Sequence, residues 1–310
     1  MINRIKTENR VEWKALRKNY IGGSDAAAIV GMNSFSSPFA VWAEKTGQVP
    51  EFEGNLATEV GTFLGEFVAK KFEEETGKTV RRCNLSLVND ELPWAIANVD
   101  RLVVGEDAGL EIKTTSALNT KSFRNGEYPA NYYVQCVHYL AVTGKAKWYL
   151  AVLIGNSDFR IFEINRDEEE IKALMDEEKK FWEGYVKTGM APPVDGNSAT
   201  TDAIKQLFTS EADGTADLGP FLDALQRRSS INKQIKALKA NVDEIDNAIK
   251  MAMQNVSSGS CLGYSVSWKT QKTSSLDRDL IKMDYPGFDF SKYATSARVF
   301  RVTEKKQKSN

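Results

Sequence analysis

The strongest constraint on the fold is a change of hydrophobic period at Gly77. Before it, residues 57–76 place apolar side chains at helical spacing, and Gly77 is a typical helix stop. After it, four short stretches read as strands separated by turn signals, at residues 80–88, 94–99, 101–104 and 109–115. A helix, a strand pair and a charged helix follow, at residues 131–142, 148–154, 159–164 and 167–187. This order predicts an α/β domain with a mixed central β-sheet flanked by helices.

A second division of the chain follows a glycine- and proline-containing stretch near Pro192. We therefore predict a first domain, a linker, a helical or coiled-coil extension with one short strand, and a disordered tail, at residues 1–190, 191–200, 201–302 and 303–310. The long amphipathic helix or helical hairpin expected at residues 216–254 is interpreted as a packing or oligomerisation element, in preference to a DNA reader.

Composition narrows the functional classes. Of the 310 residues, 42% are hydrophobic and 27% are charged, which is typical of a globular protein. No apolar run is long enough to span a membrane and no secretory signal begins the chain, so we expect no membrane partner and a cytoplasmic location. The three scattered cysteines and one histidine argue against zinc and iron–sulfur sites. The net charge of −1 gives no global signal for nucleic acid, although residues 1–20 and the tail are basic.

The residues that carry chemistry lie on two neighbouring predicted strands. Asp100 closes one strand-like run, and Glu111-Ile112-Lys113 lies in the next long strand. Because side chains alternate along a strand, Glu111 and Lys113 are expected to point to one side and Ile112 to the other. If the two strands pair as a hairpin, both carboxylates and the lysine ammonium converge on one spot.

This trio suits the hydrolysis of phosphodiesters. Two carboxylates can bind a hard divalent cation, which activates water and neutralises phosphate charge. Lys113 can stabilise the transition state or help to deprotonate the water, and the Ile112 backbone carbonyl can supply a further metal ligand. Taken alone, the same letters favour a surface salt bridge at a strand edge. Leu110 and Ile112 shift the interpretation toward a central strand, where unpaired charges are costly.

With these residues in view, the sequence resembles the YqaJ-type viral recombinase family, which includes lambda exonuclease and lies within the PD-(D/E)XK nuclease superfamily. The resemblance runs over about residues 10–190 and rests on blocks that match in order, at residues 13–17 and 21–27, 38–47, 61–77, 98–100, 110–114 and 132–144. Each block is weak alone, and their order carries the resemblance. Residues 263–269 resemble a segment appended to phage members of the family.

The resemblance implies a restriction-endonuclease-like core and a Mg²⁺-dependent 5′-to-3′ exonuclease for double-stranded DNA. Such an enzyme degrades one strand from a DNA end, and Mn²⁺ can substitute for Mg²⁺. Phage or prophage recombination systems in bacterial cells use it together with a single-strand annealing protein. Several members form ring-shaped trimers, so a homotrimer is one assembly that the resemblance allows.

The family's functional residues can be carried over position by position. Its metal ligands fall on Asp100 and Glu111, and its catalytic lysine falls on Lys113. Its contacts to the 5′-phosphate fall on Arg17 and Ser24, where a guanidinium and a hydroxyl suit a terminal phosphate. An active-site glutamine of the family matches Gln135.

One acidic position departs from the family pattern. The family's glutamate on the long helix falls on Gly65, and Glu66 lies one residue later, rotated by about 100° on a regular helix. Glu66 is therefore a fourth metal ligand only if a local bulge returns it to the site.

Two alternatives to the exonuclease stay open at the sequence level. One is a DNA-end-binding module with weak or no catalysis, and the other is an endonuclease of the same superfamily. His138 lies near Gln135 and could approach DNA, but a satisfied, partly buried histidine is the favoured interpretation.

Overall fold

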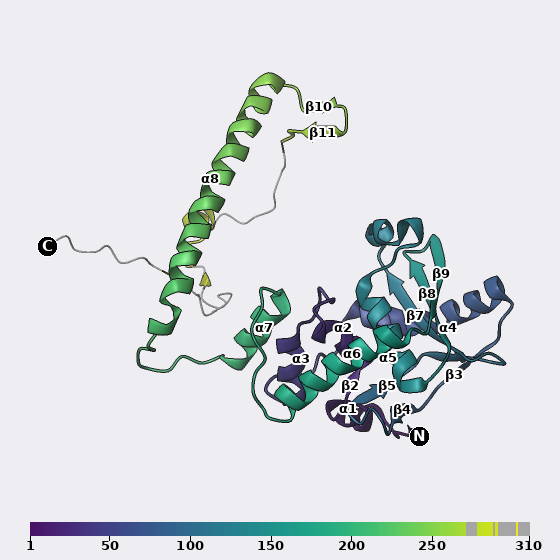
Figure 1. Ribbon diagram of the computed structural model, residues 1–310. Coiled ribbons are helices and arrows are strands. Elements are labelled where there is room, and N and C mark those ends of the chain that lie inside the picture. The colour runs from purple at the N-terminus through teal and green to yellow at the C-terminus, as the bar shows by residue number, and fades with distance from the viewer. Residues whose placement is uncertain (271–277, 288, 291–301, 303–310) are drawn as a thin grey trace. The chain divides into compact units, whose positions relative to one another are not determined.

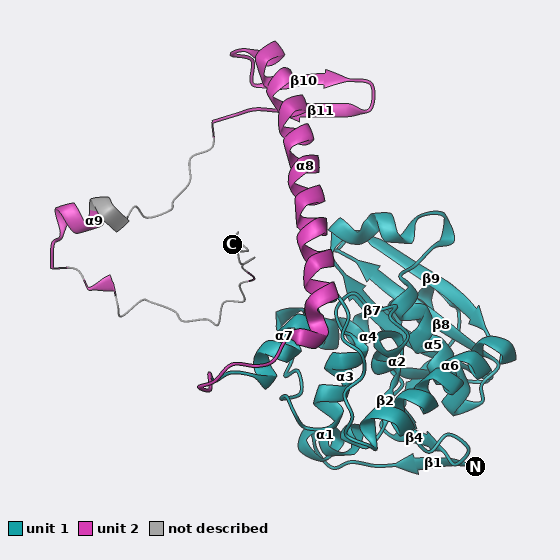
Figure 2. Ribbon diagram, turned by 60° about the vertical axis from the view of Figure 1, so that its left-hand side comes forward, with its two compact units in different colours: residues 1–210 teal, residues 211–310 magenta. Residues whose placement is uncertain are grey.

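The computed structural model describes residues 1–270, 278–287, 289, 290 and 302 (Figure 1). The chain divides into two compact units, Met1–Ser210 and Glu211–Asn310 (Figure 2). The first unit continues past residue 190, where the sequence predicts its end, because α7 (Ser198–Leu207) packs on α3 (Pro38–Lys45). Thr200 Oγ1 donates a 2.7 Å hydrogen bond to Ser37 Oγ, and both side chains are buried. The predicted linker at residues 191–200 thus includes the start of a packed helix.

A five-stranded mixed sheet, in the order β3-β6-β7-β8-β9, organises the site. Its strands are β3 (Val80–Arg82), β6 (Arg101–Val103), β7 (Ala108–Thr115), β8 (Lys147–Ile154) and β9 (Asp158–Asn165). β7 pairs in parallel with β8, whereas the other neighbours are antiparallel. The fold class predicted from the sequence, a mixed sheet flanked by helices, is confirmed, with β7 as the central strand.

The two faces of this sheet are covered by different helices. On one face, Val68 and Phe72 of α4 (Leu56–Thr76) pack with Leu110 and Ala151. On the other face, α5 (Ala130–Thr143) contributes Leu140 to the cluster that contains Trp148 and Leu150. Each helix ends at a glycine with positive φ, Gly77 at 69° and Gly144 at 67°, as expected for left-handed C-terminal caps.

A second sheet of the first unit has the order β1-β4-β5-β2. Its strands are β1 (Ile2–Ile5), β4 (Ser86–Asn89), β5 (Ala95–Ala97) and β2 (Ile21–Gly22). The single strand predicted over residues 80–88 is wrong: it divides into β3 and β4, which belong to different sheets. The chain leaves the ladders between Arg82 and Ser86, and this break lets one extended stretch serve both sheets.

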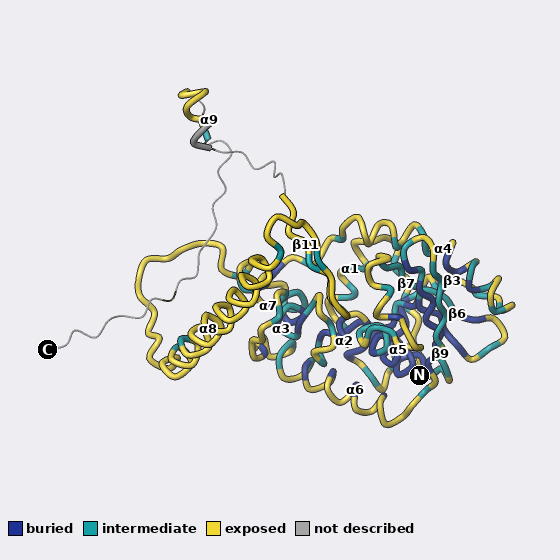
Figure 3. The backbone as a smooth tube through the Cα atoms, turned by 90° about the horizontal axis from the view of Figure 1, so that it is seen from above, coloured by how far each residue is buried: buried dark blue, intermediate teal, exposed yellow. Residues whose placement is uncertain are grey.

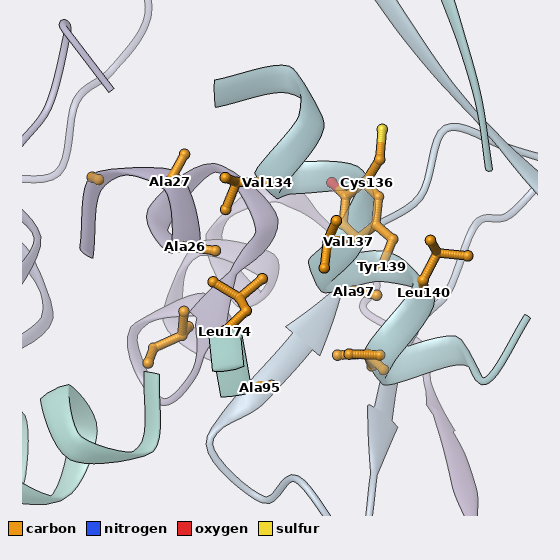
Figure 4. Packing of buried hydrophobic residues seen from close by; sticks show 14 of the residues in the cluster. Ala26, Ala27, Ala95, Ala97, Val134, Cys136, Val137, Tyr139, Leu140 and Leu174 are labelled. Carbon is orange, nitrogen blue, oxygen red and sulfur yellow. The ribbon is translucent and has the colours of Figure 1, made fainter. Parts of the chain in front are cut away.

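Short side chains bring α2 (Gly23–Ile29) close to α5. Figure 4 shows Ala26 and Ala27 of α2 beside Val134 and Val137 of α5. The remaining helical segments of this unit are α1 (Arg10–Lys18), α6 (Glu168–Phe181), and the shorter η1 (Ala117–Gly126) and η2 (Trp182–Val186). The close approach of α2 matters because its first turn lies at the candidate site.

A buried ion pair joins α5 to α6. His138 Nδ1 lies 2.8 Å from Glu178 Oε1, and His138 Nε2 donates to the Ile96 carbonyl at 3.0 Å. Burial alone lowers the pKa of His138, but the Glu178 charge and hydrogen bond outweigh it and raise that pKa. Burial raises the pKa of Glu178 as well. The expected satisfied histidine is present, and it is fully buried rather than partly buried.

The second unit contains the C-terminal helix expected from the sequence. α8 (Leu222–Met253) has no buried residue, and Figure 3 shows it exposed along its length. It is preceded by η3 (Gly219–Phe221) and followed by the hairpin β10 (Ser258–Cys261) and β11 (Tyr264–Ser267), and by α9 (Arg278–Asp284). The tail predicted at residues 303–310 lies outside the described residues. None of the helices in the described part of the chain has the length and apolarity that a membrane span requires.

Candidate active site

Asp100 lies immediately before β6, at the end of the β6–β7 ladder. Its Oδ2 atom accepts a 2.8 Å hydrogen bond from the backbone N–H of Ile112. Because Arg101 pairs with Leu110, Asp100 continues the register opposite Glu111. The hairpin expected from the sequence is present, and it brings the two carboxylates together.

Glu111 and Lys113 lie on the face of β7 that α5 covers. Lys113 Nζ is 2.7 Å from Glu111 Oε1. Gln135 of α5 links the two side chains: its Oε1 accepts from Lys113 Nζ at 2.8 Å, and its Nε2 donates to Glu111 Oε1 at 2.7 Å. Leu110 and Ile112 pack on the opposite face, with the α4 cluster. The alternation expected of a central strand is therefore present.

Two residues fix the side chain of Gln135. Tyr139, one helical turn later, accepts a 2.8 Å hydrogen bond from Gln135 Nε2 and donates one of 3.1 Å to the Asn98 carbonyl. A Cβ atom on Gly23 would lie 2.8 Å from the Tyr139 ring and 2.9 Å from Gln135 Cγ. A side chain at position 23 would therefore displace the groups that orient Gln135.

Burial and charge set the protonation of the centre. Burial and the neighbouring Asp100 charge raise the pKa of Glu111 to about 8, although Lys113 opposes that rise. Burial alone lowers the pKa of Lys113, but the charges of Glu111 and Asp100 outweigh it and raise this pKa. Lys113 is therefore a cation at neutral pH. This property suits it to stabilise negative charge rather than to accept a proton.

The oxygens of this centre fit a hard divalent cation. Glu111 Oε2 is buried and has no hydrogen-bond partner in the described structure, although its neighbour Oε1 has two. The N–H and C=O of one strand residue point to the same edge, so the Ile112 carbonyl faces Asp100 beyond the end of the β6 ladder. Among the described residues, no three His, Cys, Asp and Glu side chains cluster as a metal site. Mg²⁺ prefers a coordination shell of this kind, in which one or two carboxylates are completed by backbone, water and phosphate oxygens.

A pocket brings the other predicted residues to the same place. Arg17 and Ser24 line it together with Asp100, Glu111 and Gln135. The pocket is formed where the end of α1 and the start of α2 meet β7 and α5. Lys113 lies next to the pocket and contacts two of its lining residues.

Glu66 lies elsewhere. It belongs to α4, and its Oε1 atom bonds to Arg82 and Arg101. The side chain is 61% exposed, so water also reaches it. The helix is regular at this position, and no bulge turns Glu66 toward Asp100. Its role as a metal ligand stays a prediction, and its present partners are two arginines.

Sequence reasoning missed Tyr139, Asn98 and Gly23 as parts of the site. Tyr139 had one usable signal, because it follows Gln135 by four residues and so shares its helix face. The Asn98 carbonyl and Gly23 gave no such signal. Asn98 contacts Tyr139, which lies 41 residues away in the sequence, and Gly23 meets Gln135 and Tyr139 only because α2 packs on α5.

A family model described as the YqaJ-like viral recombinase domain matches residues 12–146. The curated protein YqaJ of Bacillus subtilis is 39% identical over 302 residues, which cover 96% of this chain and 95% of YqaJ. The chain belongs to the YqaJ-like viral recombinase family. The matched region includes every residue of the candidate site.

Two solved structures are similar to part of this YqaJ-like chain. The alkaline exonuclease LHK-Exo of Laribacter hongkongensis is 21% identical, with a TM-score of 0.49, over 58% of this chain and 94% of LHK-Exo. A phage-related exonuclease of Haemophilus somnus is 13% identical, with a TM-score of 0.39, over 59% of this chain and 91% of that one.

Proposed function

We propose that this protein is a Mg²⁺-dependent 5′-to-3′ exonuclease that hydrolyses double-stranded DNA from its ends. The observation that carries the proposal is the shared pocket, in which Asp100, Glu111 and Gln135 lie beside Arg17 and Ser24. One group of residues suits hydrolysis of a phosphodiester and the other suits binding of a phosphate. Because the two are adjacent, the bond to be cut lies close to the bound end.

The proposed chemistry divides among these side chains. Asp100, Glu111 and the Ile112 carbonyl would hold the cation, with Mn²⁺ able to replace Mg²⁺. A cation there supplies Lewis-acid chemistry, neutralising phosphate charge and making water a stronger nucleophile. Lys113 stabilises the negative charge that builds on the phosphate in the transition state, and Gln135 keeps its ammonium in place.

Arg17 and Ser24 would select the DNA terminus. A guanidinium can offer two N–H groups to one phosphate, and an exposed hydroxyl can add a third hydrogen bond. Binding of a terminal 5′-phosphate would place the neighbouring phosphodiester at Asp100 and Glu111. Hydrolysis in this arrangement would run in the 5′-to-3′ direction.

The test uses a duplex with a phosphate on one 5′ end and a hydroxyl on the other, with a label in each strand. In Mg²⁺, we expect mononucleotides to be released progressively from the phosphorylated strand, and Lys113→Ala to abolish the release. Binding without release would overturn the proposal in favour of an end-binding module. Cutting of closed circular DNA would point instead to an endonuclease.

The recombination setting is part of the same proposal. Membership of a viral recombinase family supports a phage-type system in a bacterial host, in which an annealing protein pairs the strand left single. A homotrimer that encloses the DNA is the proposed assembly. Co-purification with the annealing protein and the mass of the assembly in solution test these two points separately from the hydrolysis.

A further inference from the structure

Arg17 lies between two carboxylates whose surroundings differ. Its Nη2 atom is 3.8 Å from Asp25 Oδ1, and its Nη1 atom is 3.4 Å from Glu51 Oε1. The guanidinium carbon lies over the Trp13 ring, 4.8 Å from its centre, in a cation–π contact. The cation that lines the phosphate pocket is thus already paired in the free protein.

Asp25 is firmly held. It is buried, and its Oδ2 atom accepts from the Gly22 N–H at 3.0 Å and lies 2.7 Å from Lys45 Nζ. Lys45 Nζ also donates to the Arg17 backbone carbonyl at 3.0 Å. Asp25 therefore ties together the end of α1, the start of α2 and the end of α3. Removing one member of a buried charged group leaves another unpaired and is strongly unfavourable.

Glu51 is held loosely by comparison. It lies in the connection between α3 and α4, outside any helix or strand. In the described part of the chain, its one hydrogen bond or ion pair is the 3.4 Å contact with Arg17, which is long for a charge-assisted bond. Of the two carboxylates on Arg17, Glu51 is the one that an incoming anion can displace.

We propose that Glu51 is a displaceable counter-ion of Arg17, which a terminal DNA phosphate replaces while Asp25 keeps the guanidinium directed at the pocket. The inference rests on the phosphate-binding role proposed for Arg17. Both anions use the same guanidinium, so Glu51 competes with the phosphate. Glu51 already lines a small pocket together with Arg17, Glu44, Lys18 and Lys45, so two cations other than Arg17 lie near its carboxylate.

The local charge balance agrees with this competition. Burial and the charges of Asp25 and Glu51 raise the pKa of Glu44 to about 7. Carboxylates are therefore already close to one another beside Arg17, and a phosphate that joins them without displacing Glu51 would be repelled by them. An exonuclease creates a new 5′-phosphate in every cycle, and a counter-ion that returns to Arg17 helps each bound end to leave.

The experiment measures binding of short labelled duplexes by fluorescence anisotropy in EDTA, where hydrolysis does not interfere. Duplexes with 5′-phosphate and 5′-hydroxyl ends are compared. Glu51→Gln should tighten binding of the phosphorylated duplex about three- to tenfold, the range expected for loss of a partly exposed competing ion pair, and leave the hydroxyl duplex nearly unchanged. The matched control is Glu53→Gln, which removes the same charge from an exposed position two residues away and should affect both duplexes alike.

Two further variants locate the effect. In an Arg17→Ala background, Glu51→Gln should no longer tighten binding, because a pair that acts through one contact is not additive. Asp25→Asn should remove the preference for phosphate, with its fold checked by thermal unfolding. A wild-type protein that prefers phosphate, combined with a Glu51→Gln variant that binds it equally or more weakly, overturns this inference alone. A wild-type protein without any preference overturns the proposed phosphate clamp, and the inference with it.

Discussion

Lys113 Nζ lies 2.7 Å from Glu111 Oε1, while the other oxygen of the same carboxylate, Oε2, is buried and has no hydrogen-bond partner among the described residues. One oxygen of Glu111 is thus neutralised by a cation of the protein, and the other is free for a second cation. The two carboxylate oxygens therefore have separate roles in the proposed mechanism, one in positioning Lys113 and one in metal binding.

The first prediction concerns the charge of Lys113. Lys113→Met should lower the single-turnover rate by about 10²–10³-fold, because one charged group that stabilises the transition state is lost. DNA binding in EDTA should change little, since Arg17 and Ser24 are untouched. A variant that keeps most of the rate would show that Lys113 does not act on the reacting phosphate.

The second prediction concerns the space at Gly23. Gly23→Ala should lower the rate by about 10–100-fold, because its Cβ would push Gln135 and Tyr139 from their positions. Gly65→Ala is the matched control: its Cβ meets nothing within 4 Å, and it should stabilise α4 by about 1 kcal/mol. Rates and urea unfolding of both variants separate misplacement from loss of fold. Equal rates in the two variants would exclude the steric role of Gly23.

A third prediction concerns Glu66. Because its present partners are Arg82 and Arg101, Glu66→Gln should leave the Mg²⁺ dependence of the rate unchanged. The measurement is the rate as a function of Mg²⁺ concentration in the wild type and the variant. A clear shift of this curve to higher Mg²⁺ would instead make Glu66 a ligand, as the family pattern suggests.

The fourth prediction is a pH dependence of stability. The folded-state pKa values of His138 and Glu178 are both raised, so the folded pair keeps its proton where the unfolded His138 has lost it. The contribution of His138 is complete below the ordinary histidine pKa of about 6.5 and is lost as pH rises through its higher folded value. The raised pKa of Glu178 acts in the same direction, and its loss begins above the ordinary glutamate pKa of about 4.3. Unfolding free energies from urea titrations should therefore fall on the alkaline side.

The control for this effect is the double variant His138→Gln, Glu178→Gln, whose stability should depend less on pH over the same window. Each single variant leaves one buried charge or polar group unpaired and should cost about 3–5 kcal/mol at pH 6.5. Parallel pH profiles in the wild type and the double variant would exclude the pair as the source.

Local patterns predicted β7 well. The alternation in Glu111-Ile112-Lys113 determines which side chains share a face, and the structure has them as expected. The ends of the helices at Gly77 and Gly144 could also be predicted from the sequence, because a glycine cap is a local property. The packing of α7 on α3 involves residues about 160 positions apart, so the composition change near residue 190 could not reveal it.

The other features that the sequence did not predict depend on contacts between segments far apart in the chain. Glu66 meets Arg101 because β6 lies next to β3 at the edge that α4 reaches, and no spacing in the sequence encodes that arrangement. Asp25 meets Lys45 for a similar reason, since only the folded chain brings the start of α2 to the end of α3. The sequence therefore identified the candidate site residues, whereas their hydrogen-bond and ion-pair partners could be found only in the structure.

In the proposed mechanism, Asp100 and Glu111 hold the cation on which hydrolysis depends. The most direct test of this role is the single-turnover release of nucleotides from a 5′-phosphorylated duplex over a range of Mg²⁺ concentrations, for the wild type, Asp100→Asn and Glu111→Gln. The wild-type rate should rise from zero in EDTA to a plateau, and neither variant should reach a comparable rate at any Mg²⁺ concentration. Release by the wild type in EDTA, or a wild-type curve in either variant, would contradict the account.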